Sequence, residues 1–98
     1  MEPTQGTRLK AVRKAARISQ EEMARRFGQA KASICRYESD DATVSVERML
    51  QWAAHCKWGT DVAQWIGFGG KAPNKAIGNA LRELLEEARI RAAKKGAA

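Results

Sequence analysis

The sequence predicts an all-α protein in which five short helices are followed by a longer amphipathic helix. Between positions 18 and 38, apolar side chains recur at spacings of three and four on both sides of Gly28, as in two helices joined by a turn. Ser19 is placed to cap the first of these helices, with Glu22 at the capping-box position, and Gly28 is placed to end it with a positive φ. A further apolar stripe, over 77–92, has the same helical period. Periodicity and matched start and stop signals therefore agree on helices.

The order of the elements follows from these signals. Residues 1–6 are expected to form a disordered arm. Helices are expected at about 7–16, 20–27 and 31–38, followed by a polar loop at 39–43, a fourth helix from near Ser45, and a fifth that is capped by Thr60 and ends at Ile66. The expected inward positions of the fourth helix are Val46, Met49, Leu50, Ala53 and Ala54.

Residues 67–73 separate a five-helix domain at 1–66 from a C-terminal segment at 74–98. Glycines before Lys71 invite comparison with a phosphate-binding loop, but alanine follows the lysine where Ser or Thr is needed, and the leading glycine spacing is absent. Glycine makes the backbone flexible and Pro73 cannot continue a helix, so a hinge is expected here.

The C-terminal segment is expected to form an amphipathic helix capped by Asn74. A single helix of this length is marginal in water, so its apolar stripe must be buried. Pairing with the same helix of a second copy is the preferred interpretation, while packing on its own domain and capture of a different protein are the alternatives. The expected dimerisation residues are Ile77, Leu81, Leu84, Leu85 and Ala88, together with Trp65.

The whole chain has a net charge of +7, and its basic residues are concentrated in the first part of the sequence. Residues 1–37 hold nine Lys and Arg against three Glu, whereas 38–66 hold two basic and five acidic residues. Such a concentration of positive charge releases counterions from phosphates and speeds association with nucleic acid. A solvated charged surface is the alternative, and the segregation of charge favours nucleic acid.

A longer pattern extends beyond the two central helices. It consists of Ser19-Gln20-Glu21-Glu22, Ala24, Phe27-Gly28, Ser33-Ile34 and Arg36-Tyr37-Glu38, with Leu9 to Arg13 upstream and Ser45 to Cys56 downstream. Over Leu9 to Ile66 the sequence thereby resembles the phage-repressor-like (Cro/XRE-type) helix-turn-helix regulators. The resemblance implies that the third helix lies in the major groove of DNA and that the second crosses the backbone.

The same resemblance assigns roles to individual positions. Lys31 and Arg36 would donate to guanine, and the Ala32 methyl would touch thymine. Arg13 and Glu38 match a buried ion pair that ties the first helix to the third. The implied contacts are to bases from Lys31, Ala32 and Arg36, and to the DNA backbone from Gln20, Ser33 and Lys14.

Three departures from the family pattern stand out. Gln29 replaces a residue that is usually apolar, and Ala30 cannot cap the third helix with a side-chain oxygen. Asp40 and Asp41 occupy a loop where relatives often place glycine and basic residues. Phosphate contacts from this loop are therefore not expected.

Side chains for catalysis or metal binding are few. His55 and Cys56 are adjacent, but zinc needs three or four ligands. A disulfide between Cys35 and Cys56 is not expected in a protein with cytosolic features. Cys35 on the third helix could respond to oxidation, with small apolar filler as the alternative. No enzymatic activity, metal or cofactor is expected.

The sequence therefore predicts a DNA-binding transcriptional regulator, in the first place a homodimeric repressor on a palindromic operator. An antitoxin whose C-terminal helix binds a toxin is the first alternative, and an interaction protein that does not read DNA is the second. The expected partners are double-stranded DNA and a second copy, with a protein at the C-terminal helix in the antitoxin case. No apolar run reaches the roughly 18 residues of a membrane span and no signal-peptide core is seen, so the cytoplasm, in association with the nucleoid, is the expected location.

Overall fold

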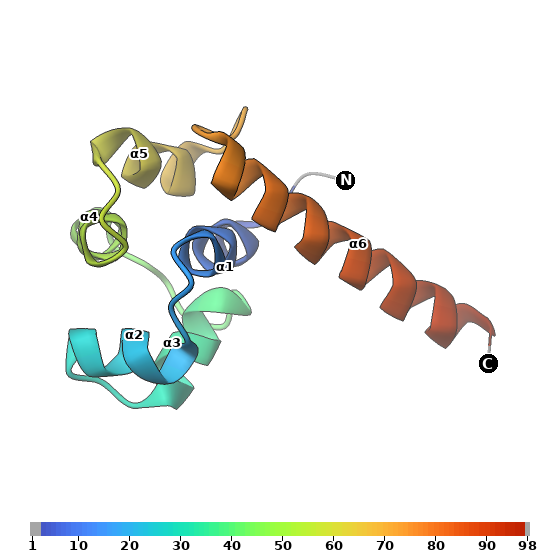
Figure 1. Cartoon of the computed structure of the whole chain (residues 1–98). Coiled ribbons are helices and arrows are strands. Elements are labelled where there is room, and N and C mark those ends of the chain that lie inside the picture. The colour runs from blue at the N-terminus through green and yellow to red at the C-terminus, as the bar shows by residue number, and fades with distance from the viewer. Residues whose placement is uncertain (1–2, 98) are drawn as a thin grey trace.

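The computed structural model describes residues 3–97, and this part of the chain is all helical, as predicted (Figure 1). Five short helices form the N-terminal domain and a sixth, longer helix follows. The helices are α1 (Gln5–Ala15), α2 (Gln20–Phe27), α3 (Lys31–Glu38), α4 (Val46–His55), α5 (Thr60–Phe68) and α6 (Lys75–Ala97).

The local signals around α2 and α4 act as the sequence indicates. The Ser19 hydroxyl accepts from the Glu22 amide at 3.1 Å, and the Ser45 hydroxyl accepts from the Arg48 amide at 3.1 Å. Gly28 ends α2 in the left-handed conformation, with φ 64°. The predicted bounds of α2 and α3 are confirmed, and both ends of α2 are fixed by a neighbouring residue.

Two other helix starts differ from the prediction. α1 begins at Gln5, inside the expected arm, because the Thr4 hydroxyl caps it by accepting from the Thr7 amide at 3.2 Å. Thr60 is the first residue of α5 rather than its cap, and α5 continues to Phe68. The connection to α6 is therefore shorter than the expected hinge and begins at Gly69.

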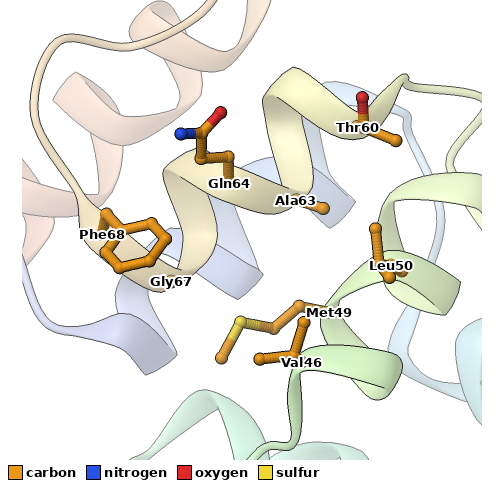
Figure 2. Close-up of a pocket in the computed structure, with 8 residues that line it drawn as sticks. All are labelled: Val46, Met49, Leu50, Thr60, Ala63, Gln64, Gly67 and Phe68. Atoms are coloured by element: carbon orange, nitrogen blue, oxygen red, sulfur yellow. The ribbon is translucent and has the colours of Figure 1, made fainter.

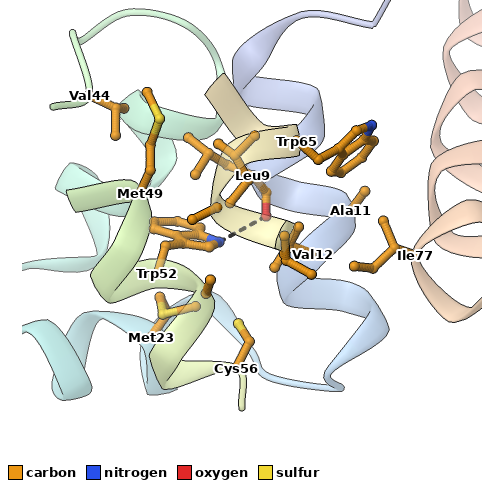
Figure 3. Packing of buried hydrophobic residues seen from close by; sticks show 14 of the residues in the cluster. Leu9, Ala11, Val12, Met23, Val44, Met49, Trp52, Cys56, Trp65 and Ile77 are labelled. Atoms are coloured by element: carbon orange, nitrogen blue, oxygen red, sulfur yellow. Dashed lines mark hydrogen bonds between the residues drawn. The ribbon is translucent and has the colours of Figure 1, made fainter. Parts of the chain in front are cut away.

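The core lies where α1, α4 and α5 meet, and Figure 3 shows its packing. Trp52 is its largest fully buried side chain, and its indole Nε1 donates to the carbonyl oxygen of Leu9 at 3.0 Å. This bond satisfies the polar atom of the indole in an apolar environment. The other fully buried side chains of large volume are Leu9, Met23, Ile34, Ile66, Ile77, Val12 and Val62.

The predicted inward face of α4 is wrong in part. Met49 and Ala53 are buried as expected, but Val46 is 72% exposed and Leu50 is 44% exposed. Ala54 is exposed as well. The physical reason is that the row of α4 through Met49, Trp52 and Ala53 faces the core, which turns the neighbouring i, i+4 row, containing 46, 50 and 54, away from it.

α6 packs against α1 of its own domain and then runs past it (Figure 1). Ile77, Ala80 and Leu84 are buried in this contact. The preceding connection is held by the Trp65 indole Nε1, which donates to the carbonyl oxygen of Gly70 at 3.0 Å. Packing on its own domain, the alternative interpretation of the apolar stripe, therefore holds for the first half of α6. None of the described helices combines the length and apolarity needed to cross a membrane.

Candidate nucleic-acid interface

The turn between α2 and α3 leaves the start of α3 on the surface. The amides of Gly28 and Gln29 donate back to carbonyls near the end of α2 and close that helix. Ala30 provides no side-chain cap to α3, as its sequence indicates. Lys31 follows as the first residue of α3, so the backbone amides of its first turn have no side-chain oxygen over them.

The three side chains expected to reach bases share the exposed side of α3. Lys31, Ala32 and Arg36 are all exposed, and Ala32 and Arg36 are four residues apart on one face. Ile34, on the opposite side of the helix, is fully buried. Ser33, the expected backbone contact, is partly exposed. α3 therefore presents a polar and cationic surface over an apolar anchor.

A buried polar network anchors α3 to α1 and α2. Arg13 of α1 donates to both carboxylate oxygens of Glu38, from Nε to Oε2 at 2.5 Å and from Nη2 to Oε1 at 3.0 Å. Gln20 adds a third donor, from Nε2 to Oε1 of Glu38 at 3.0 Å. Arg13 and Glu38 are only 6% and 8% exposed. The two residues that the resemblance pairs thus form a bidentate ion pair, which fixes the angle at which α3 projects.

Lys31 has an acidic neighbour on α2. Its ammonium Nζ lies 2.6 Å from Oε1 of Glu21, and both side chains are more than half exposed. The hydrogen bond from Lys31 holds the pKa of Glu21 below its ordinary value, and the same bond holds the pKa of Lys31 above its own. Both groups are therefore charged near neutral pH. No local pattern in the sequence indicates this pair, because its members lie on different helices.

Part of the basic charge of residues 1–37 has a structural use. Arg8 Nε donates to the carbonyl oxygen of Ile66 at 2.9 Å, and Arg26 Nη1 donates to that of His55 at 2.6 Å. Together with the buried Arg13, these side chains join helices of the same chain. Lys14, expected at the DNA backbone, is exposed in the last turn of α1.

Asp40, one of the departures from the family pattern, caps α1. Its carboxylate Oδ1 accepts from the amide of Gly6 at 2.7 Å, and Asp40 itself adopts a left-handed conformation with φ 64°. A Cβ at Gly6 would lie 2.5 Å from the carbonyl oxygen of Glu38. The close approach of α1 to the end of α3 therefore requires glycine at position 6, and Asp40 binds a backbone amide of its own chain.

Comparison with known proteins identifies the family of the chain. A family model described as helix-turn-helix matches residues 9–57. The chain belongs to this Cro/C1-type helix-turn-helix (XRE) family. No curated protein and no solved structure gives a significant match. The family consists of DNA-binding regulators, and the matched region covers α2, α3 and α4 together with most of α1.

The cysteines of this helix-turn-helix protein differ in their surroundings. Cys35 is partly exposed, and its thiol donates to Oε1 of Gln20 at 3.2 Å. Cys56 is buried, and this burial raises the pKa of its thiol to about 12. Within the described residues no three His, Cys, Asp or Glu side chains gather closely enough to hold a metal ion.

The residues expected to dimerise this helix-turn-helix protein do not form one free surface. Ile77, Leu84 and Trp65 are buried within the single chain. Leu81 and Leu85 are partly buried, and Ala88 is exposed. Because α1 already covers the first half of the stripe, only its later positions remain accessible on the folded monomer.

An apolar groove between α4 and α5 is a second accessible surface (Figure 2). Its volume is about 430 Å³. Phe68 at the end of α5 is 86% exposed, and it lies on this groove with the exposed Val46 and Leu50. Sequence reasoning missed this surface because it assigned Val46 and Leu50 to the core. The α4–α5 groove is lined by Val46, Met49, Leu50, Thr60, Ala63, Gln64, Gly67 and Phe68.

Proposed function

We propose that the protein is a sequence-specific transcriptional repressor that binds a two-fold symmetric operator as a homodimer. The observation that carries the proposal is the exposed start of α3, with Lys31, Ala32 and Arg36, on a helix that a buried ion pair holds in a fixed orientation. A regulator of this kind acts on the nucleoid in the cytoplasm. Repression follows when the bound protein occupies a promoter.

In the proposed complex the first turn of α3 enters the major groove. Arg36 donates in bidentate fashion to guanine O6 and N7, and the Ala32 methyl contacts a thymine methyl. Gln20 donates one Nε2 proton to Glu38, and its second Nε2 proton remains to donate to a phosphate oxygen. Ser33 and Lys14 are the other proposed phosphate contacts, and they set the register of the protein without reading sequence.

We place the contact between the two copies at the α4–α5 groove. Its lining carries no charged side chain, whereas the chain has a net charge of +7, so two copies meet there at the lowest electrostatic cost. Phe68 supplies an exposed apolar side chain beside a hollow that Ala63 and Gly67 leave open. A two-fold axis lets each Phe68 enter the groove of the other copy, as a self-complementary interface requires.

A second candidate function draws on the free end of α6. Its last turns extend past the domain (Figure 1), and Ile90 there is 49% exposed. This end offers a surface to which a different protein could bind. In an antitoxin of this kind, the first five helices would bind DNA and the last helix would bind the toxin. The later stripe positions could equally pair two copies through α6.

Selection of bound sites from random double-stranded DNA tests the proposed function. We expect the full chain to enrich a two-fold symmetric sequence whose half-sites are one helical turn apart, about 34 Å. Enrichment of no sequence would reject specific binding. Sedimentation equilibrium on Phe68→Glu and Ile90→Glu then separates the surfaces: only Phe68→Glu should yield monomers. Loss of the dimer with Ile90→Glu alone would assign it to α6.

A further inference from the structure

Glu21 is an acidic side chain beside the surface proposed to meet DNA. The other acidic residues of α2 and α3 are engaged elsewhere: Glu22 pairs with Arg25 at 3.0 Å, and Glu38 is buried against Arg13. Glu21 instead reaches from α2 to Lys31, the first residue of the reading helix. A carboxylate at this position repels phosphate, so its presence needs a physical explanation.

Stability does not supply that explanation. Glu21 is 60% exposed and Lys31 is 54% exposed, and ion pairs so open to water contribute little to folding. The pair does change how α3 meets DNA. Because Lys31 is neutralised by Glu21, it adds little to the general attraction of the protein for phosphates. Its ammonium lies 2.6 Å from Oε1 of Glu21, so the two side chains present their remaining donors and acceptor together.

The pair presents a definite order of donors and acceptors. The Lys31 ammonium has three protons, of which one is given to Oε1 of Glu21, so two remain to donate. Oε2 of Glu21 keeps its capacity to accept. A protein surface with two donors followed by an acceptor is complementary to a base pair that presents two acceptors followed by a donor in the major groove. Guanine N7, guanine O6 and cytosine N4 of a G·C pair have this order, and an A·T pair does not.

We propose that Glu21 is a specificity-determining residue, which accepts from the cytosine N4 amino group of the G·C pair whose guanine is bound by Lys31. This inference rests on the proposed function, since it requires α3 in the major groove. Glu21 thus has two effects. It adds one base contact on the operator, and it weakens binding to DNA of any other sequence.

Glu21→Ala tests the inference, with Glu86→Ala as the matched control, because Glu86 forms an exposed ion pair with Arg89 on α6. Both variants remove one carboxylate from a surface ion pair. Sites are selected from random double-stranded DNA with each variant and with the unchanged chain. Affinities for the selected operator and for a random duplex are then measured over a range of salt concentrations.

With Glu21→Ala, we expect the preference for G·C at one position of each half-site to fall about tenfold, within the range for one good base contact. Binding to the random duplex should strengthen, and its salt dependence should steepen by about one phosphate, because Lys31 is released. Glu86→Ala should select the same sequence as the unchanged chain. The same sequence and salt dependence with Glu21→Ala would overturn the inference and leave the proposed function standing. Failure of the unchanged chain to enrich any sequence would overturn both.

Discussion

The buried ion pair between Arg13 and Glu38 yields the sharpest prediction on stability. Glu38 accepts three hydrogen bonds, and Arg13 donates two of them. Arg13→Met keeps an apolar side chain of similar length but leaves the Glu38 carboxylate, on a side chain that is 4% exposed, with a single donor, Gln20. Breaking a buried pair in this way costs about 3 to 5 kcal/mol, a large part of the roughly 5 to 15 kcal/mol that stabilises a small domain.

Urea unfolding followed by tryptophan fluorescence measures this cost. With a denaturant slope of about 1.5 kcal/mol per molar, the Arg13→Met midpoint should fall by roughly 2 to 3 M. The double variant Arg13→Met/Glu38→Leu should recover much of the loss, because no charge then remains buried. Arg89→Met, which breaks an exposed pair with Glu86, is the control and should cost under about 1 kcal/mol. Equal losses for Arg13→Met and Arg89→Met would show that the pair of Arg13 with Glu38 contributes no more to stability than an exposed one.

Three further predictions concern packing, assembly and reactivity. Gly6→Ala should destabilise the fold by about 1 to 3 kcal/mol in urea, since its Cβ would meet a carbonyl oxygen at 2.5 Å, whereas Gly78→Ala, whose Cβ would have no neighbour nearer than 3.7 Å, should be neutral or stabilising. Phe68→Glu should give folded monomers in sedimentation equilibrium, with a urea midpoint that falls only by the stabilisation that dimerisation contributes, and a dimer that survives it would remove the α4–α5 groove from the proposal. The raised pKa of Cys56, about 12, keeps its thiol protonated near pH 8.5, where about half of an exposed cysteine is ionised. Mass spectrometry should therefore find iodoacetamide on Cys56 only after unfolding, and labelling of the native protein at Cys56 would contradict the buried position.

Local signals carried the prediction of α2 and α3. Ser19 and Gly28 act on amides and carbonyls within the same helix, so their effect can be deduced from neighbouring residues alone. The pairing of Arg13 with Glu38 came from resemblance and not from spacing. Lys31, Ala32 and Arg36 lie on the surface where the resemblance implies, and their contact with bases stays a prediction.

Contacts between segments that are distant in the sequence could not be predicted from local sequence patterns. The apolar stripe of α6 indicates that one face of the helix must be buried, but it does not indicate against which surface. In the structure, α1 covers Ile77 and Leu84. The bond from Gly6 to Asp40 joins residues 34 positions apart, and no local pattern marks it. Periodicity alone assigned Leu50 to the core. This was wrong because the row of α4 that is exposed depends on how α4 packs against the other helices.

If the exposed side of α3 reads bases, Arg36→Ala must weaken binding to the operator far more than binding to DNA of other sequence. Affinities of this variant and of the unchanged chain are measured by fluorescence anisotropy, on the selected operator and on a random duplex of equal length at the same salt concentration. Loss of a bidentate guanine contact should weaken operator binding by about 1 to 3 kcal/mol, roughly 5- to 150-fold, with little change on the random duplex. Equal weakening on both duplexes would show that Arg36 holds a phosphate, and it would contradict base reading at that position.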